Sequence, residues 1–519
     1  EAGKYYNFSN IRYGAPPVGD LRFAAPTAPA INRTLNDGQQ STICAQATPL
    51  WISIMLSYLS GASPEQLKRQ EEQLNAIKES LSVDTISNFE PLDPRTSEDC
   101  LFLDVMVSED TFNQKKASPV LVWIHGGGYV AGHKSSAGNP ENILMEAQSK
   151  GEGIVFVTMN YRLGLFGWLS GPTYRAEDGL PNAGLFDQRL ALKWVQQNVH
   201  LFGGDPSRVT VMGESAGAGS IMHHITSWGS SDENLFQQAI LQSPGYYPIV
   251  TYNEQEKKYK SVISQAQNLI DNNITTISDL KNLDFISLTA LNRIIVAKSA
   301  PYGTFSFGPV VDGTYVPELP SVLMRKGKSK KSLNVLTAHN SDEGYIFTSP
   351  FLDDTFIASQ IAIIFPSASD ETRSYMLENI WPPIYDGSQP YLTPNERASL
   401  LISELTFSCY ARYTALAYPN SSFSYVFAVP PGYHSIDVAY TFYNVDNKYV
   451  NSTVARKLQS IIINFVQSGT PNGPDVAGFP PYLPDSKTLV LSNSSVDSVQ
   501  TDTAANYRCS WLQNTDFSS

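Results

Sequence analysis

Basic residues are scarce in this chain. Its 519 residues include 36 Lys and Arg against 49 Asp and Glu, which gives a formal net charge of −13 at pH 7. Binding to nucleic acid depends on clustered Lys and Arg, and the basic run at residues 325–331 is short enough to be a solvated loop. The composition therefore excludes nucleic acid as an expected partner.

Long apolar runs are missing as well. No window of 18 consecutive apolar residues occurs, so the sequence predicts no membrane span. The length alone would allow two or three domains, but we find no linker, internal repeat or low-complexity tract at which to divide the chain. We therefore expect one large domain, residues 1–519, with insertions.

Cysteine is rare, and its spacing argues against a metal site. The four cysteines are far apart and form no C-x-x-C pair, so no bound metal is expected. An even number of cysteines suits disulfides in a secreted protein, and three pairings are possible among Cys44, Cys100, Cys409 and Cys509. Glycosylation sequons also fit secretion, although roughly five would arise by chance; they lie at Asn7, Asn32, Asn273, Asn420, Asn451 and Asn493.

A serine between glycines is the most informative feature that is present. The run Gly213-Glu214-Ser215-Ala216-Gly217 follows a strand-like segment, residues 208–212, and precedes small residues that suit a helix. This is the context of the G-x-S-x-G elbow, where glycines flank the serine because a side chain would clash. The helix N-terminus favours negative charge developing beside the serine oxygen. We interpret Ser215 as a nucleophile.

A second glycine-rich turn lies upstream. His125-Gly126-Gly127-Gly128 follows a buried-strand pattern at residues 120–124, as in the H-G-G-G type of oxyanion loop. We predict that a tetrahedral oxyanion would be held by the backbone N–H groups of Gly127, Gly128 and Ala216. The simpler alternative is a tight turn that merely needs glycine.

Strand and helix patterns alternate along the chain. Helical spacing occurs at residues 188–199, and strand-like runs occur at residues 101–107, 120–124, 154–159, 209–212, 239–242, 333–338 and 424–429. This alternation predicts an α/β fold, with a mostly parallel central sheet and helices on both faces. Residues 461–466 favour a late helix, and we expect mainly helical cap or side regions at residues 250–330 and 350–420.

Residues 45–99 differ from their surroundings. A strongly apolar stretch, residues 50–59, is followed by a polar helical pattern, and Cys44 and Cys100 bracket the whole segment. One interpretation is a lid-like flap over the active site, with an apolar face that contacts substrate or lipid. The alternative is a helix that simply packs on the core.

A nucleophilic serine needs a base, and the base needs an orienting acid. In the α/β-hydrolase order both follow the serine, with the acid first. Among the seven histidines, His434 fits best because it lies in a loop just after a late strand. His339 lies four residues before Glu343, and we interpret it as shaping the loop that carries the acid. Glu343 and Asp342 both suit that acid, and chain order does not choose between them.

Several further motifs resemble the type-B carboxylesterase/lipase family. Residues 11–17 and 21–23 resemble the family's entry motif, and Ser97-Glu98-Asp99-Cys100-Leu101-Phe102-Leu103 resembles its E-D-C-L-x-L signature. Residues 160–162, 182–188 and 202–206 lead into the elbow as they do in the family. The resemblance covers nearly the whole chain and implies an α/β-hydrolase fold with large cap insertions.

The resemblance also implies roles for particular residues. It selects Glu343 as the acid, in a D-E-G motif, whereas its G-x-x-H base motif matches residues 432–434 only loosely. It implies the disulfides Cys44–Cys100 and Cys409–Cys509, the ion pairs Arg22–Glu98 and Arg162–Asp187, and a substrate pocket lined by Phe305, Phe307, Ile346 and Phe347. Because the chain starts later than family members usually do, the first edge strands are expected to be missing or short. Trp51 does not align as a choline site.

The sequence therefore predicts a secreted serine carboxylic ester hydrolase that acts through an acyl-enzyme on Ser215 and needs no cofactor. Its substrate would be a small-molecule or lipid ester. One alternative is a lipase or sterol esterase whose segment 45–99 opens during transient contact with a lipid interface. Another is a non-catalytic recognition module of the same family.

Overall fold

A ten-stranded sheet forms the centre of the computed structural model, which describes residues 5–38, 41–114, 116–229, 233–249, 251–352 and 354–515. The strand order is β1-β2-β4-β3-β5-β6-β7-β8-β9-β10. The strands from β4 to β9 in this order are parallel, whereas β1, β2 and β10 pair antiparallel with their neighbours. The strands are β1 (Tyr5–Arg12), β2 (Phe102–Ser108), β3 (Ser118–Ile124), β4 (Val155–Met159), β5 (Gly204–Glu214), β6 (Gln238–Gln242), β7 (Asn334–Asn340), β8 (Ser422–Phe427), β9 (Lys487–Leu491) and β10 (Ser498–Thr501).

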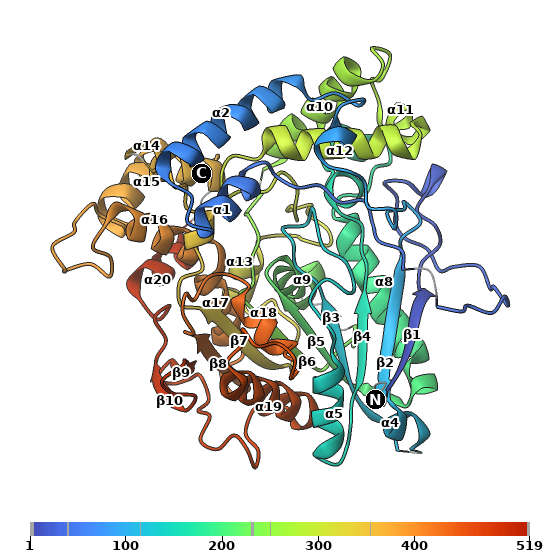
Figure 1. The fold of residues 1–519 in the computed structure, drawn as a ribbon, viewed down its shortest axis with the longest axis vertical. Helices are drawn as coiled ribbons and strands as arrows, with labels where there is room; N and C mark the ends of the chain where they lie inside the picture. Colours follow the sequence, from blue (N-terminus) through green and yellow to red (C-terminus); the bar gives the residue numbers. More distant parts are fainter. Residues whose placement is uncertain are drawn as a thin grey trace.

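Helices cover both faces of this sheet (Figure 1). On one face lie α8 (Ala183–Asn198), α9 (Ala216–Ile225) and α17 (Cys409–Ala417), and on the other lie α5 (Glu141–Ser149) and α19 (Ser452–Ser468). Strands β2, β3, β4 and β6 are buried at every position, as a sheet covered on both faces requires. The predicted α/β fold is confirmed.

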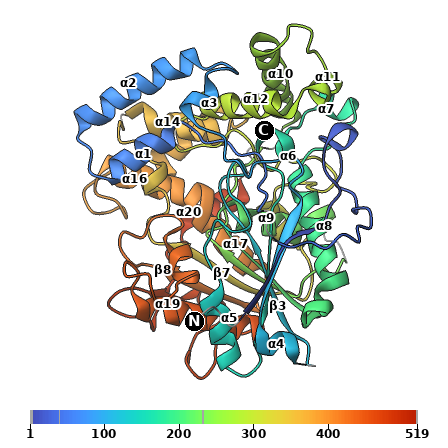
Figure 2. The ribbon, with the colours of Figure 1, turned by 45° about the vertical axis from the view of Figure 1, so that its right-hand side comes forward.

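Further helices gather beyond one end of the sheet, at the top of Figures 1 and 2. Segment 45–99 forms α1 (Trp51–Leu59), α2 (Pro64–Ser80) and α3 (Ile86–Phe89). Trp51 and Ile54 of α1 are buried, and Ile54 packs with Ile294 of α12. The expected cap or side regions, residues 250–330 and 350–420, are mainly helical. They contain α10 (Tyr252–Leu269), α11 (Ile277–Asn282), α12 (Phe285–Ser299), α13 (Pro320–Arg325), α14 (Asp354–Ile364), α15 (Asp370–Tyr375), α16 (Pro394–Ser403) and π-helical turns at Met376–Ile380 and Glu404–Ser408.

Short helices complete the described structure: α4 (Glu109–Asn113), α6 (Gly164–Trp168), α7 (Pro172–Ala176), α18 (Ile436–Thr441) and α20 (Tyr507–Asn514). Within the described ranges, no helix combines the length and the apolar character needed to cross a bilayer. The ion pairs implied by the family resemblance are both present and buried: Arg22–Glu98 at 2.5 Å and Arg162–Asp187 at 2.8 Å.

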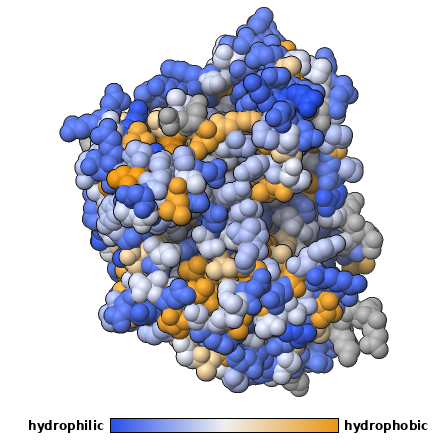
Figure 3. Space-filling view, turned by 60° about the vertical axis from the view of Figure 1, so that its left-hand side comes forward, coloured by the Kyte–Doolittle hydropathy of each residue, from blue (hydrophilic) through white to orange (hydrophobic). Residues whose placement is uncertain are grey.

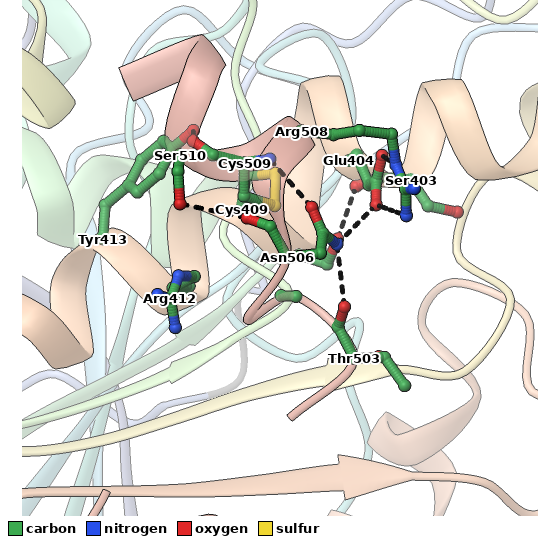
Figure 4. The surroundings of a disulfide bond; sticks show 12 residues. Ser403, Glu404, Cys409, Arg412, Tyr413, Thr503, Asn506, Arg508, Cys509 and Ser510 are labelled. Carbon is green, nitrogen blue, oxygen red and sulfur yellow. Dashed lines mark hydrogen bonds and ion pairs between the residues drawn. A yellow bond between two sulfur atoms is a disulfide. The ribbon is translucent and has the colours of Figure 1, made fainter. Parts of the chain in front are cut away.

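Two disulfides join distant parts of the chain, with the pairing that the resemblance implies. Cys44–Cys100 closes the base of segment 45–99, and Cys409–Cys509 joins α17 to α20. Figure 4 shows that a buried ion pair lies beside the second disulfide. There Arg508 donates to both oxygens of Glu404 at 2.7 Å. The π-helical turn that begins at Glu404 is therefore held to the C-terminal helix.

The sheet ends in two irregular edge strands. β1 spans eight residues, so the expectation of a missing or short first strand is wrong. Its pairing with β2 shifts register between Phe8 and Ile11, and Asn36 Nδ2 covers its outer side by donating to the carbonyls of Ser9 and Asn10. β10 is four residues long and largely exposed.

Candidate active site

The serine elbow joins β5 to α9. β5 ends at Glu214, α9 begins at Ala216, and Ser215 between them has φ 55° and ψ −124°. A positive φ is costly for a residue with a side chain, and such strain is typical of functional positions. A Cβ added at Gly217 would come within 2.0 Å of the Ile124 carbonyl oxygen, so glycine is needed where α9 passes the end of β3. The local sequence thus fixes Ser215 at the carboxyl end of the sheet.

The glycine loop after β3 lies beside this serine. Gly127 and Gly128 have φ values of 105° and 59°, and a Cβ on Gly127 would lie 2.2 Å from the carbonyl oxygen of Ala131. Gly128, Ser215 and Ala216 line one cavity. Within the described part of the chain, the backbone N–H groups of Gly127, Gly128 and Ala216 donate no hydrogen bond. Free amides beside a serine are what an oxyanion site requires.

His434 follows β8, and its Nδ1 binds Glu343. Its Nδ1 lies 2.6 Å from Glu343 Oε2, and both side chains are buried. Glu343 Oε1 accepts from Ser243 Oγ and from the backbone N–H of Asn340, each at 2.5 Å. Asp342 instead accepts from Ser399 Oγ at 2.5 Å. Of the two neighbouring acids, Glu343 is therefore the one that faces the imidazole.

The second imidazole nitrogen faces the serine elbow. His434 Nε2 lies 3.2 Å from Glu214 Oε1, on the residue immediately before Ser215. Glu214 Oε1 also accepts from Ser435 Oγ at 2.5 Å. Nε2 has no hydrogen-bond partner in the structure as described, so its bond to the Ser215 hydroxyl is not formed here. Catalytic hydrogen bonds are often long or misaligned before substrate binds.

Three buried carboxyl groups surround this single imidazole. Burial by itself lowers the pKa of His434, but the negative charges of Glu214 and Glu343, with the hydrogen bond that Nδ1–H donates to Glu343, raise it above 6.5. Burial also raises the pKa of Glu214. Burial and the charges of Glu214 and Glu343 raise the pKa of Asp437 to about 7. The site therefore favours an imidazolium ion, the species that forms when a histidine takes a proton from serine.

The cavity at Ser215 is small, about 30 Å³. Phe305 and Phe307 line it, as the family resemblance implies, but Ile346 and Phe347 are not among its lining residues. The reason is local: residues 345–347 form a 3₁₀ turn after Glu343. This turn places the Phe347 ring 5.3 Å from the His434 ring and packs Ile346 into the neighbouring apolar cluster.

Other lining residues were missed by the sequence analysis. Phe407 lines the cavity, and its ring centroid lies 4.1 Å from that of His434. It sits on the π-helical turn Glu404–Ser408, which no sequence pattern indicates. Tyr129 also lines the cavity, and its position directly after the glycine loop could have revealed it. His339, which was expected to shape the loop that carries Glu343, forms a hydrogen bond with Asp502. The His339 Nε2 atom lies 3.0 Å from Asp502 Oδ1.

The fold and the elbow place the protein in the α/β-hydrolase class, whose strand–turn–helix serine has this form. The chain belongs to the carboxylesterase family, whose model matches residues 1–511, and it is a carboxylic ester hydrolase.

Individual relatives agree with this assignment. The chain is 36% identical to Carboxylesterase patB of Aspergillus clavatus, over 99% of this chain and 93% of that protein. It is 28% identical to Lipase 1 of Geotrichum candidum, over 96% of this chain and 90% of that protein. Among solved structures, Aspergillus niger EstA superposes with a TM-score of 0.79 at 25% identity, covering 99% of this chain and 95% of that one.

Proposed function

We propose that the protein hydrolyses carboxylic esters through an acyl-enzyme on Ser215. His434 Nε2 takes the hydroxyl proton as Ser215 Oγ attacks the ester carbonyl, and Glu343 holds Nδ1–H in the required tautomer. The N–H groups of Gly127, Gly128 and Ala216 stabilise the oxyanion. His434 then gives the proton to the leaving alcohol, and a water molecule deprotonated by His434 releases the acid.

The observation that carries this proposal is the orientation of the buried imidazole. Nδ1 of His434 is bound to Glu343 at 2.6 Å. Nε2 has no hydrogen-bond partner in the described structure and lies 3.2 Å from Oε1 of Glu214, the residue before Ser215. One nitrogen is thus fixed and the other is free to accept a proton near the elbow. This arrangement supports a general base and gives no support to a non-catalytic module.

Replacing the nucleophile tests the proposal. In Ser215→Ala we expect hydrolysis of p-nitrophenyl butyrate to fall by on the order of 10⁴-fold or more, because the covalent route is lost. An organophosphonate should label the wild-type protein at Ser215 and leave the variant unlabelled. Ser207→Ala, at an exposed position near the start of β5, is the matched control and should keep full activity. Turnover retained by purified Ser215→Ala would refute the role of this serine.

We infer that the protein is secreted. Both disulfides suit an oxidising compartment, and the sequon residues Asn7, Asn32, Asn273, Asn420 and Asn493 are exposed. Asn451 differs because its side chain caps α19 by accepting from the N–H groups of Thr453 and Val454. Glycosidase treatment of protein expressed through a secretory pathway should lower its mass. Mapping of the glycans should leave Asn451 unmodified.

A lipase with a movable α1 is the second candidate. The Trp51 ring of α1 lies 5.8 Å from Phe305, a residue of the serine cavity, and α1 also exposes Leu56 (55%) and Leu59 (41%). If α1 opens at a lipid surface, activity should rise sharply once the substrate concentration exceeds the solubility of the substrate. The face turned forward in Figure 3 carries separate apolar patches among hydrophilic residues rather than one continuous apolar surface. A smooth, saturating response to emulsified tributyrin would favour an esterase.

A further inference from the structure

A second, much larger cavity adjoins the serine cavity. Its volume is about 340 Å³, within the range of small-molecule sites, whereas the serine cavity has room for about one water molecule. Phe305 and Phe307 line both cavities, as do Tyr247, Ile249 and Gly308. An acyl group longer than acetyl on Ser215 therefore has the larger cavity as its nearest free volume, directly behind these two rings.

The larger cavity has an apolar side and a polar side. Apolar side chains come from α10, α12 and α14 and include Val262, Ile295 and Ile364. On the polar side, Ser299 and Ser306 share a hydrogen bond between their hydroxyl oxygens at 2.9 Å, and Ser261 also lines the wall. A ligand that fits this cavity would be apolar along its length and polar at one end.

Lys258 supplies the charge at the polar side. Its ammonium donates to the carbonyl oxygen of Ser306 and lies 5.5 Å from the centre of the Phe307 ring. It forms no ion pair within the described residues, although an ammonium has three donors. Burial lowers the pKa of Lys258 to about 8, so the group still carries a proton at neutral pH. A partly buried cation without an anionic partner is costly and favours an anionic ligand.

Among the described residues, Glu254 is the one carboxylate that lines this cavity, and it is already hydrogen-bonded. Glu254, one helical turn before Lys258, accepts from the N–H of Thr251 at 3.1 Å and from Ser367 Oγ at 2.9 Å. The first bond is half of the capping box that begins α10, in which Thr251 is the N-cap and its Oγ1 accepts from the N–H of Glu254. Its charge raises the pKa of Lys258, opposing the effect of burial, but does not neutralise the ammonium by direct contact.

We propose that the larger cavity binds the distal part of the acyl group, and that Lys258 selects acyl groups ending in a carboxylate. This inference rests on the proposed ester hydrolysis at Ser215. The substrate class would be half-esters of straight-chain dicarboxylic acids: the ester carbonyl at Ser215, the methylene chain past Phe305 and Phe307, and the carboxylate at Lys258. A charge-assisted hydrogen bond of this kind is shorter and stronger than one between neutral groups.

Pairs of p-nitrophenyl esters with equal chain length test the selection. The pairs are mono-p-nitrophenyl adipate against hexanoate, suberate against octanoate, and sebacate against decanoate, each compared by kcat/KM at pH 7. For at least one chain length we expect Lys258→Met to lower the ratio of kcat/KM for the carboxylated ester to kcat/KM for the plain ester by about tenfold or more, because the ionic hydrogen bond is lost. Because the readout is the ratio within each pair, a general effect of the substitution on the cavity cancels, and Lys258→Arg should retain most of the wild-type ratio.

Lys257→Met is the matched control, because Lys257 precedes Lys258 on the same helix and is exposed. It should leave every ratio unchanged. Equal ratios in Lys258→Met and Lys257→Met at all three lengths would overturn the proposal, as would an equal loss for both members of each pair. If Lys258→Met does not fold, Lys258→Gln replaces it.

A binding measurement separates this inference from the proposed chemistry. Suberate should bind to the Ser215→Ala protein in calorimetry about tenfold or more tightly than octanoate, and Lys258→Met in that background should abolish the preference. If the ester assays fail but suberate still binds, the role of Ser215 is wrong and the carboxylate site stands. If esters are hydrolysed but neither suberate nor its half-ester is preferred, the carboxylate site is wrong.

Discussion

His434 lies between two buried carboxylates, Glu343 at Nδ1 and Glu214 near Nε2, and their charges set the pH range in which it can act as a base. A general base must be neutral before it accepts a proton. Because the pKa of His434 is raised above 6.5, kcat/KM should fall as the pH drops through that raised value. An unperturbed histidine would give an acid limb near about 6.5, and the neighbouring carboxylates move the expected limb to higher pH.

Neutralising Glu214 should therefore shift the pH profile. In Glu214→Gln one negative charge beside Nε2 is lost, so the pKa of His434 falls and the acid limb of kcat/KM moves to lower pH. A pH series from 5 to 9 with p-nitrophenyl butyrate measures the limb. Glu72→Gln, on the exposed face of α2, is the control and should leave the limb in place. A purely structural role for Glu214 would lower activity at every pH without moving the limb.

Phe305 separates the serine cavity from the larger one behind it. Phe305→Ala should join the two volumes and raise kcat/KM for decanoate relative to acetate by about tenfold, because a long acyl chain no longer has to displace the ring. A chain-length series of p-nitrophenyl esters measures the change. Leu288→Ala, a buried position on α12 outside both cavity linings, controls for general loosening of the cap and should leave the ratio unchanged. An unaltered ratio in Phe305→Ala would show that long chains take another route.

Among the elements, the π-helical turn Glu404–Ser408 connects the C-terminal helix to the active site. Glu404 at its start accepts hydrogen bonds from Arg508, Asn506 and Trp381, and Phe407 near its end contacts the His434 ring. A π turn adds a residue to a helical turn and is frequent at functional sites. Here it turns Phe407 toward the imidazole while α20 holds the base of the turn.

Removing the arginine of this ion pair should destabilise the protein strongly. Arg508→Met leaves the buried Glu404 charge without its cation, and we expect the free energy of unfolding to fall by about 3–5 kcal/mol. Arg12→Met is the control because the pair Arg12–Asp99 is about one-third exposed and should contribute less than about 1 kcal/mol. Urea denaturation of both variants measures the difference. Similar losses in the two variants would contradict this account.

The sequence predicted elements well where burial leaves a periodic pattern. The parallel strands from β3 to β8 were found from their apolar runs, because both faces of these strands are covered. β1, β9 and β10 were missed, since strands at or near a sheet edge carry weak patterns. Phe407 and Lys258 were missed for a different reason. Their roles depend on a helical irregularity and on contact with residue 306, and neither leaves a local signal.

For the whole molecule, a buried pair joins the sheet to the C-terminal segment. His339 on β7 lies 3.0 Å from Asp502, which precedes α20. Burial alone would lower the pKa of His339, but the hydrogen bond and charge of Asp502 raise it to about 9. The folded state therefore binds this proton more tightly than the unfolded chain, where the pKa is about 6.5. The contribution of this proton to the free energy of unfolding is fully present below pH 6.5 and is lost as the pH rises through about 9.

This linkage predicts a pH-dependent effect of His339→Gln. The variant should lose on the order of 3 kcal/mol of unfolding free energy at pH 6, and the loss should shrink toward pH 10 as the wild-type imidazole becomes neutral. Chemical denaturation of wild type and variant at both pH values gives the difference. His200→Gln is the control, because His200 is exposed, and its effect should be equal at the two pH values. A loss in His339→Gln that does not vary with pH would contradict the linkage.

The two margins of the sheet have a consequence for how the molecule behaves when crowded. An unpaired margin of a β-sheet is a template to which another polypeptide can add, and long flat margins promote fibre growth. Here the register shift in β1, the amide of Asn36 across Ser9 and Asn10, and the brevity of β10 leave little regular backbone for an incoming chain. The enzyme is thereby protected from sheet-to-sheet polymerisation at high concentration.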